Sequence, residues 1–417
     1  MDIAFEIITK TAFIWGPILC LLLFWRLWVY FLNYRAALKV DGILLNIKIP
    51  KEILKSPQAM ELFFDSAMYQ KSPNTWWKKY VLGEVRPWWS LEIVSIEGAV
   101  YFFIWTPKFW KDHIEAQLYA QYPQAEVIEV PDYTDAIANE LKDGRWEGFF
   151  SHHRLTKPDA YPIKTYIDYG LDKAVGSLDE NQRIDPITSV IEWMGSIGPG
   201  EQIWMQILVQ ATKKRFPKGG SWFGKTDWKD EAYAEIEKII NEHGVSRRAV
   251  AEGEEQETSF RNLSKGKQET VSSIERSIDK YGYDCGVRTL YLAESSKFRA
   301  INIKSLLSAF QIYSSPGHNG FAPDDKNITG VDFPWQDPTD HLVAFRQKRI
   351  FNSFRMRSMF YPPHIPVFGE KKGNRKPFVL TSEELATIFH FPGTVSETPS
   401  FSRIDSKKAE PPSNLPL

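Results

Sequence analysis

Cysteine is almost absent from this sequence of 417 residues. The two cysteines, Cys20 and Cys285, lie far apart, and Cys20 falls within an apolar segment, so no disulfide framework can form in the rest of the chain. The eight histidines include no pair spaced i,i+3 or i,i+4, and none has a cysteine companion. His152 and His153 are adjacent and would point apart on a strand. The sequence therefore predicts structural histidines and no metal site.

Net charge is also lacking, because 51 Lys and Arg residues are balanced by 52 Asp and Glu residues, for a formal net charge of −1. A chain with almost no net charge does not attract a charged partner over its whole surface, so any basic binding site must be local. A nucleophile elbow, a metalloprotease helix and paired catalytic carboxylates with a supporting signature are all missing. We therefore expect a protein that is not an enzyme and that binds no cofactor.

One long apolar run is present, Thr11 to Leu32, in which Arg26 is the only charged residue. Its length suits a transmembrane helix, and we predict an anchor over residues 1–35. A cleaved signal peptide is the alternative, but the acidic start and the absence of a small-x-small cleavage site disfavour it. Arg35 and Lys39 follow the run, so the positive-inside rule predicts a single-pass protein of the inner (cytoplasmic) membrane whose C-terminal part is cytoplasmic.

The segment 40–135 has the order strand, helix, strand, strand, helix, strand. Strands are expected at 43–49, 89–93, 99–105 and 125–130, because these runs are apolar or alternate between apolar and polar residues. Ser56-Pro57 and Thr106-Pro107 are typical helix starts. This order predicts a ferredoxin-like (βαββαβ) module. Aromatic residues make up 14% of the chain, which favours ample buried core.

A second ferredoxin-like module is expected over residues 155–320. Its predicted strands are 163–167, 202–211 and 283–292, its helices start at Asp185-Pro186 and Ser296, and a helical insertion occupies 214–282. Residues 378–380 are a candidate fourth strand. The fold class is therefore α+β, with an N-terminal transmembrane helix before two ferredoxin-like modules.

The remaining segment, 321–417, is expected to be less regular. His341 to Phe360 can form a basic amphipathic helix. Thr381-Ser-Glu-Glu384 is a capping box ahead of a short helix. The tail from Lys407 to Leu417 is polar and rich in proline, which is typical of a linker or a docking peptide.

The stretch from Gly219 through Gly224, Lys225 and Thr226 matches the P-loop pattern GxxxxGK[ST]. A P-loop needs a strand that ends directly before it and a helix that starts within it. Here the preceding strand ends near Ala211, and the next helix is expected from 229. No apolar run ending in an acidic residue follows to hold magnesium. The context therefore disfavours a nucleotide site.

Basic residues concentrate late in the chain, interleaved with aromatic residues and nearly free of acidic ones. Three interpretations are open: a surface that contacts the phosphates of DNA, a face held against anionic lipid, and a solvated helix face. The candidate phosphate contacts, to nucleic acid or lipid, are Arg346, Lys348, Arg349, Arg355, Arg357, Lys371, Lys372, Arg375 and Lys376.

Phe378 to Gly393, followed by Lys407 to Pro416, resembles the region just upstream of the motor domain in membrane-bound ATPases of the type IV secretion coupling-protein and HerA-like kind. Leu44 to Pro50, Thr106 to Lys108 and Glu115 to Pro123 resemble the anchored N-terminal region of such proteins in candidate-phyla bacteria. That region has no catalytic residues to carry over. The sequence given ends at Leu417 without a motor, so the resemblance implies a motor ATPase supplied in trans.

We therefore expect a non-enzymatic, membrane-anchored subunit of a type IV secretion or conjugation-like DNA-transfer machine, which docks a cytoplasmic ATPase at the membrane. The expected partners are the membrane, that ATPase, DNA and a second copy of this chain. The alternatives are a membrane-tethered NTPase that uses Gly219–Thr226 and a lipid-facing scaffold unrelated to DNA.

Overall fold

The structure is a computed structural model of the chain. It describes residues 2–50, 55–70, 75–140, 145–172, 185–213, 216–217, 225–243, 245–247, 258–260, 263–330, 333, 335, 337–339, 341–362 and 377–393. The expected tail, 407–417, lies outside these residues.

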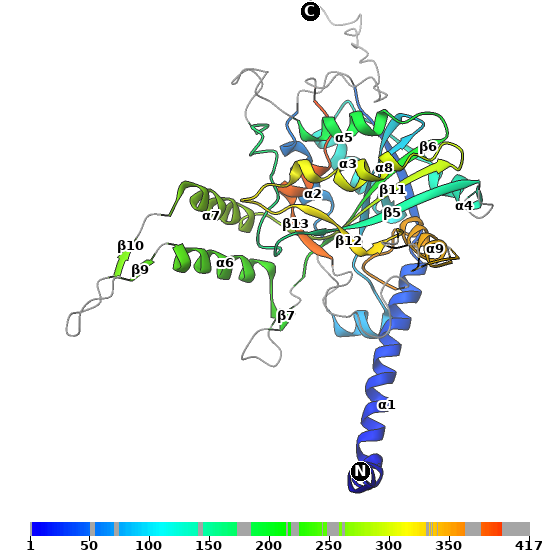
Figure 1. Ribbon diagram of the computed structural model, residues 1–417, viewed down its shortest axis with the longest axis vertical. Helices are drawn as coiled ribbons and strands as arrows, with labels where there is room; N and C mark the ends of the chain where they lie inside the picture. The colour runs from blue at the N-terminus through cyan, green and yellow to red at the C-terminus, as the bar shows by residue number, and fades with distance from the viewer. Residues whose placement is uncertain are drawn as a thin grey trace, which may run out of the picture.

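The first helix, α1 (Asp2–Leu38), stands out from the body (Figure 1). Its stretch Lys10–Leu38 is long and apolar enough to cross a membrane, and none of its most apolar window is buried. Apolar side chains along it are open to the surroundings, as Phe13 and Leu21 are, at 75% and 66% exposed. Its C-terminal part joins the body: Trp25 and Trp28 contact Tyr80, and Ala37, in the last turn, packs against the core.

The body is built on one antiparallel nine-stranded sheet, with strands in the order β12-β5-β11-β6-β2-β3-β1-β4 and β13 paired to β11. The first half of the chain supplies β2, β3, β1 and β4. Its elements are β1 (Gly42–Lys48), α2 (Gln58–Ala67), η1 (Lys78–Leu82), β2 (Trp89–Ile96), β3 (Ala99–Pro107), η2 (Lys108–Trp110), α3 (Lys111–Gln121) and β4 (Glu126–Val130). The strands and helices expected over 40–135 are therefore present.

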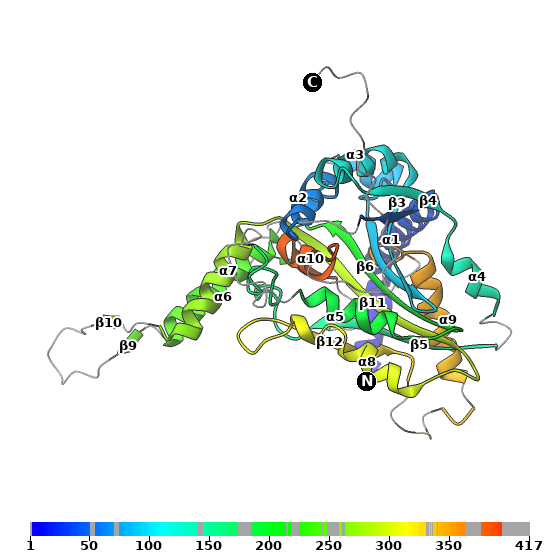
Figure 2. The same ribbon diagram turned by 90° about the horizontal axis from the view of Figure 1, so that it is seen from above.

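The segment 133–328 supplies β12, β5, β11 and β6. Its elements are α4 (Tyr133–Glu140), β5 (Trp146–Leu155), α5 (Pro186–Gly195), β6 (Glu201–Ala211), β7 (Phe216–Pro217), β8 (Lys225–Thr226), α6 (Trp228–His243), β9 (Val245–Arg247), β10 (Thr258–Phe260), α7 (Lys265–Ile278), β11 (Gly282–Glu294), α8 (Ala300–Ser308), η4 (Gln311–Tyr313) and β12 (Phe321–Ile328). Helices α6 and α7 project together as an arm (Figure 2).

One strand predicted in this segment is absent, and another is present in a different place. Residues 163–167 form no strand: 163–165 are irregular and 166–167 belong to a turn. The Thr165 amide donates to the Asp168 carboxylate and the Tyr166 amide donates to the Thr387 hydroxyl, not to a neighbouring strand. The first strand is β5, which begins at Trp146, ahead of the expected boundary at 155. The strand beyond β5 at the sheet edge is β12, whereas residues 378–380 lie in β13 and pair with Cys285 to Tyr283 of β11.

The C-terminal elements are α9 (His341–Arg355), β13 (Phe378–Thr381) and α10 (Ser382–Ile388). The predicted capping box is confirmed: Thr381 Oγ1 accepts from the Glu384 amide, and Glu384 Oε2 accepts from the Thr381 amide at 2.8 Å. Every residue from Phe378 to Pro392 is buried. This segment is part of the core.

Two apolar layers cover the sheet. One face carries α2, α3, α5, α8 and α10, and side chains such as Phe64, Ile191 and Leu385 fill the space between. The opposite face carries α9, through Ile350 and Phe354, together with α4 and the end of α1. Figure 1 shows α1 and α9 on the same side of the body, with α3 and α5 on the other.

Replacement of Thr381 by Ala is expected to destabilise the full chain by about 1–2 kcal/mol, because it removes the N-cap acceptor of a buried helix. The measurement is the thermal midpoint in detergent, which should fall by roughly 2–4 °C for each kcal/mol. Thr381→Ser keeps the hydroxyl and is the matched control. An equal loss in both variants would mean that the methyl group matters and the cap does not.

Candidate functional site

The segment Thr75–Gly83, which we call the foot, packs directly on α1. The Trp25 ring of α1 stacks on Trp76 at 6.3 Å and 14°, and it contacts the Tyr80 ring at 5.4 Å. The Trp28 indole donates to the Tyr80 carbonyl at 3.0 Å. The foot therefore lies against the C-terminal part of the apolar run of α1, beside the body (Figure 1).

The foot closes with Gly83, which a larger residue could not replace easily. Its φ of +72° lies in the left-handed region, and a Cβ atom would stand 3.3 Å from both the Cβ and the carbonyl oxygen of Leu32. Its amide donates to the Lys78 carbonyl and so ends the turn of η1. Glycine thus lets the foot approach the α1 backbone closely.

The outer surface of the foot is apolar and basic. Trp76, Trp77 and Leu82 are about 60% exposed, at 60%, 59% and 60%. Lys78 and Lys79 are exposed beside them. Lys78 lies 3.6 Å from Glu84, and the Lys79 amine lies 4.7 Å from the centre of the Tyr80 ring. In the sequence this segment is recognisable only as the start of a Trp-rich loop, Trp76-Trp77 to Trp88, with no sign of its contact with α1.

Arg357, one of the predicted phosphate contacts, is not available to a ligand. It is 1% exposed, and its guanidinium donates to both Glu92 oxygens, at 3.0 and 3.2 Å, and to Asp132. The Arg357 carbonyl accepts from the Trp88 indole at 3.0 Å. Its role is to neutralise carboxylates beneath α9, and the prediction of a phosphate contact is wrong for this residue.

Of the other predicted phosphate contacts, some bond to other groups of the protein, some are exposed to solvent, and some lie outside the described residues. Arg355 pairs with Asp135 on the surface, and Arg346 donates to the Gly330 carbonyl at 2.9 Å. Lys348 and Arg349 are exposed. Arg349 lies over the Phe345 ring at 6.0 Å, and partial burial together with the charge of Arg346 lowers its pKa. Lys371, Lys372, Arg375 and Lys376 lie outside the described residues.

A line of buried polar side chains crosses the sheet beneath α9. Gln206 donates to Glu92 at 3.0 Å and to the Phe354 carbonyl at 3.2 Å. Arg288 donates to Gln206 at 3.2 Å and to the Ser353 carbonyl at 2.8 Å. Sheet side chains thus satisfy carbonyls at the C-terminal end of α9, where a helix leaves acceptors free. The line fixes the position of this helix.

Asp132 and Tyr133 show the electrostatics of this network. Burial raises the pKa of Asp132, but the guanidinium of Arg357 outweighs it and holds that pKa below its ordinary value. The Tyr133 hydroxyl donates to Glu92 at 2.8 Å, and burial together with the Glu92 charge raises the pKa of Tyr133 well above its ordinary value. The network therefore favours the ionised form of Asp132 and the neutral phenol of Tyr133.

The P-loop pattern does not have the geometry of a phosphate site in its described part. Lys225 and Thr226 form β8, which pairs with Phe216 and Pro217 of β7, and α6 begins only at Trp228. In a P-loop both residues would lie at the start of the helix. Gly219 and Gly224 lie outside the described residues.

Histidines and carboxylates do not gather as a metal site within the described residues, where no group of three His, Cys, Asp or Glu could hold an ion. His153 lies in the sheet, and burial lowers its pKa to about 3, so it is neutral. His390 contacts the Ala386 carbonyl and the Asp185 carboxylate, at 2.8 and 3.0 Å.

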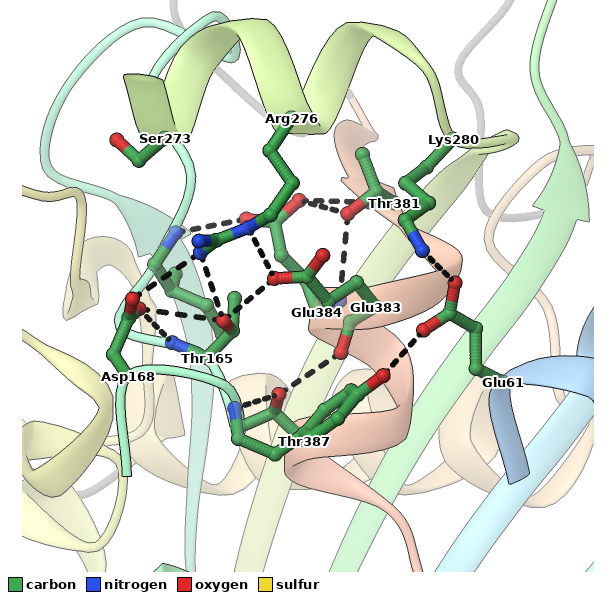
Figure 3. Close-up of polar contacts among 12 residues, drawn as sticks. Glu61, Thr165, Asp168, Ser273, Arg276, Lys280, Thr381, Glu383, Glu384 and Thr387 are labelled. Carbon is green, nitrogen blue, oxygen red and sulfur yellow. Dashed lines mark hydrogen bonds and ion pairs between the residues drawn. The ribbon is translucent and has the colours of Figure 1, made fainter. Parts of the chain in front are cut away.

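A second polar cluster joins the arm to the body (Figure 3). On α7, Arg276 pairs with Glu383 at 3.1 Å and with Asp168 at 3.2 Å, and Lys280 pairs with Glu61 at 2.6 Å. Glu384 accepts from the Ile163 amide at 2.8 Å. These residues look like ordinary surface charges in the sequence, and only the fold brings them together.

Two carboxyl groups of this region, those of Glu384 and Asp65, have a raised pKa. Burial raises the pKa of Glu384 to about 7, against the opposing hydrogen bonds from Thr381 and Ile163. Burial raises the pKa of Asp65 to about 6, against a hydrogen bond from Ser382, and the charge of Glu61 adds to the rise. Burial in the folded chain thus raises the pKa of both groups above that of an ordinary carboxyl group.

Arg357→Met is expected to cost about 3–5 kcal/mol, because it leaves Glu92 buried without its cation. Arg355→Met, two residues away, removes an exposed pair and should change the free energy of unfolding little. The measurement is denaturant unfolding of the full chain in detergent micelles. Similar losses in the two variants would contradict the assigned role of Arg357.

Asp65→Asn is expected to flatten the dependence of stability on pH. Between about pH 4 and 6 the unfolded chain releases this proton and the folded chain keeps it, so the free energy of unfolding falls as the pH rises. The thermal midpoint should therefore drop less from pH 4 to 6.5 in Asp65→Asn than in the wild type. Asp112→Asn, on the surface of α3, is the control and should follow the wild type.

Comparison with known proteins gives a family and no activity. No curated protein matches the chain. A family model described as a domain of unknown function (DUF8128) matches residues 72–403, which include the foot, the sheet from β2 onward, α9 and α10. Since the match covers most of the sequence, the chain belongs to the DUF8128 family.

Proposed function

We propose that this protein is a non-enzymatic, single-pass subunit of the inner (cytoplasmic) membrane whose body lies in the cytoplasm. Helix α1 supports the anchor, because its apolar side chains are exposed over a stretch long enough to cross a bilayer. Arg35 and Lys39 at its end support the cytoplasmic orientation.

The observation that carries the proposal is the placement of the two ends of the described chain on opposite faces of the sheet. Helix α1 enters beside α9, where Ala37 and Val40 pack. Helix α10 packs among α2 and α5 on the other face. The body therefore separates the anchor from α10. Such a body is suited to hold a partner at a fixed distance from the membrane.

That partner, we propose, is the motor ATPase of a type IV secretion or conjugation-like DNA-transfer machine. Support comes from Phe378–Gly393, which resembles the region just upstream of the motor in membrane-bound ATPases and which here is buried in the core. Contact with DNA through Lys348 and Arg349, and self-association of the chain, remain part of the same proposal.

We also propose that the sheet consists of two ferredoxin-like units. In each half the elements follow the order βαββαβ, and the strand orders β4-β1-β3-β2 and β12-β5-β11-β6 correspond position by position. The units meet through the second strand of each, β2 and β6.

Docking is expected on the face away from α1. Phe109, at 78% exposed, and Ile301, at 62%, lie there on η2 and α8. Replacing both with Glu should weaken capture of the proposed partner, a type IV secretion-like motor ATPase, and so should ending the chain at Arg403. Phe345→Glu, on α9, should have no effect. The measurement is binding of the purified ATPase to the full chain in nanodiscs, and equal binding by all variants would exclude this face.

A further inference from the structure

We propose that the foot lies in the headgroup layer of the bilayer that α1 crosses, and that Lys78 and Lys79 bind anionic lipid headgroups there. The inference rests on the proposed anchoring by α1 and adds a second, lipid-specific attachment. The partner of the exposed tryptophans of the foot is then the headgroup layer of the lipid bilayer.

The depth of the foot follows from its contacts with α1. Arg26 is the only charge in the apolar run, and Trp25 and Trp28 flank it, so these two turns belong at the membrane–water boundary. The foot packs on the same turns, from Trp25 to Leu32, a length of about 10 Å at the rise of an α-helix. A segment that touches α1 at this level cannot stand clear of the headgroups.

The side chains of the foot suit that layer. Trp76, Trp77 and Leu82 present large apolar surfaces that α1 and the body leave uncovered. In water such a cluster within eight residues would be unfavourable, whereas indole rings are enriched at the membrane interface. Lys78 and Lys79 lie directly beside the tryptophans and offer ammonium groups to phosphate oxygens. Phe109 and Ile301, the exposed apolar residues proposed above for docking, lie on the other face, away from α1.

A second attachment would fix the orientation of the body. Only residues 39–41 connect α1 to β1, and Gly83 holds the foot against Leu32. With the foot in the headgroups, the body cannot tilt freely about this short connection. The exposed face of α9, with Lys348 and Arg349, stays on the membrane side (Figure 1).

The first test measures depth with the full chain in nanodiscs. In a Cys20→Ser background, in which Cys285 is buried, a fluorescent NBD label is attached at Leu82→Cys, Leu21→Cys or Ile301→Cys. The Leu82 label should be blue-shifted and quenched by lipids that carry a doxyl group near the headgroup, and the Ile301 label should be quenched by aqueous iodide. A lipid-embedded Leu21 label with a water-exposed Leu82 label would overturn the foot and leave the anchor. Water exposure of both would overturn both.

The second test addresses lipid charge. Emission of the Leu82 label should shift further to the blue when phosphatidylcholine nanodiscs include phosphatidylglycerol, and high salt should reverse the shift. Lys78→Glu with Lys79→Glu should abolish this dependence on lipid charge, while Lys304→Glu on α8 should keep it. The Leu21 label should respond to neither change. A Leu82 signal that is the same in both lipid mixtures, or the same in the double variant as in the wild type, would overturn headgroup binding.

Discussion

The pairing of β2 with β6 is the interaction on which the rest of this structure depends. Trp89 to Ile96 pairs with Val209 to Gln202 over the full length of β2, and this pairing joins two groups of four strands that come from successive segments of the chain, 42–130 and 146–328. Without this pairing each group would expose an edge strand with unpaired backbone groups. Since helices cover both faces of the joined sheet, β2 and β6 are buried on both sides. Any polar side chain on these strands must therefore find its partner inside the protein.

Glu92 shows how this requirement shapes the face that carries the anchor. Its carboxylate is fully buried in β2, so its charge has to be neutralised by a cation from another element. Arg357, just after α9, supplies that cation, and Gln206 and Arg288 extend the hydrogen bonds to the carbonyls at the end of the helix. The basic residues of this part of the chain therefore lie in two different settings. Arg357 is buried in the core, where it neutralises Glu92, whereas Lys348 and Arg349 are exposed on the surface.

Local signals in the sequence were sufficient for elements with a distinct start, and insufficient for contacts between distant segments. Asp185-Pro186 and Thr381–Glu384 predicted the starts of α5 and α10, because capping depends on neighbouring residues. The strand β5 was missed, since its middle, Phe150 to His153, is buried on both faces and so lacks the alternation that reveals a half-buried strand. Arg357 could not be told apart from Arg349, because its partner Glu92 lies 265 residues away. The position of the foot against α1 was missed, because contacts such as Trp25 with Trp76 join segments about 50 residues apart.

The arm of α6 and α7 is tied to the same body by charge and not by a large apolar surface. Its own small core, with Ile236 and Ile274, joins the helices to each other. Arg276 and Lys280 join them to α10 and α2, where Glu383 and Glu61 are buried. Moving the arm away would leave both carboxylates in an apolar setting without a cation, which is unfavourable. A partner that displaced the arm would therefore also disturb α10, the helix that precedes the exit of the chain, whereas a partner that bound the arm in place would stabilise α10. The coupling runs through the helix layer, on the face away from α1, and leaves the contacts of the anchor unchanged.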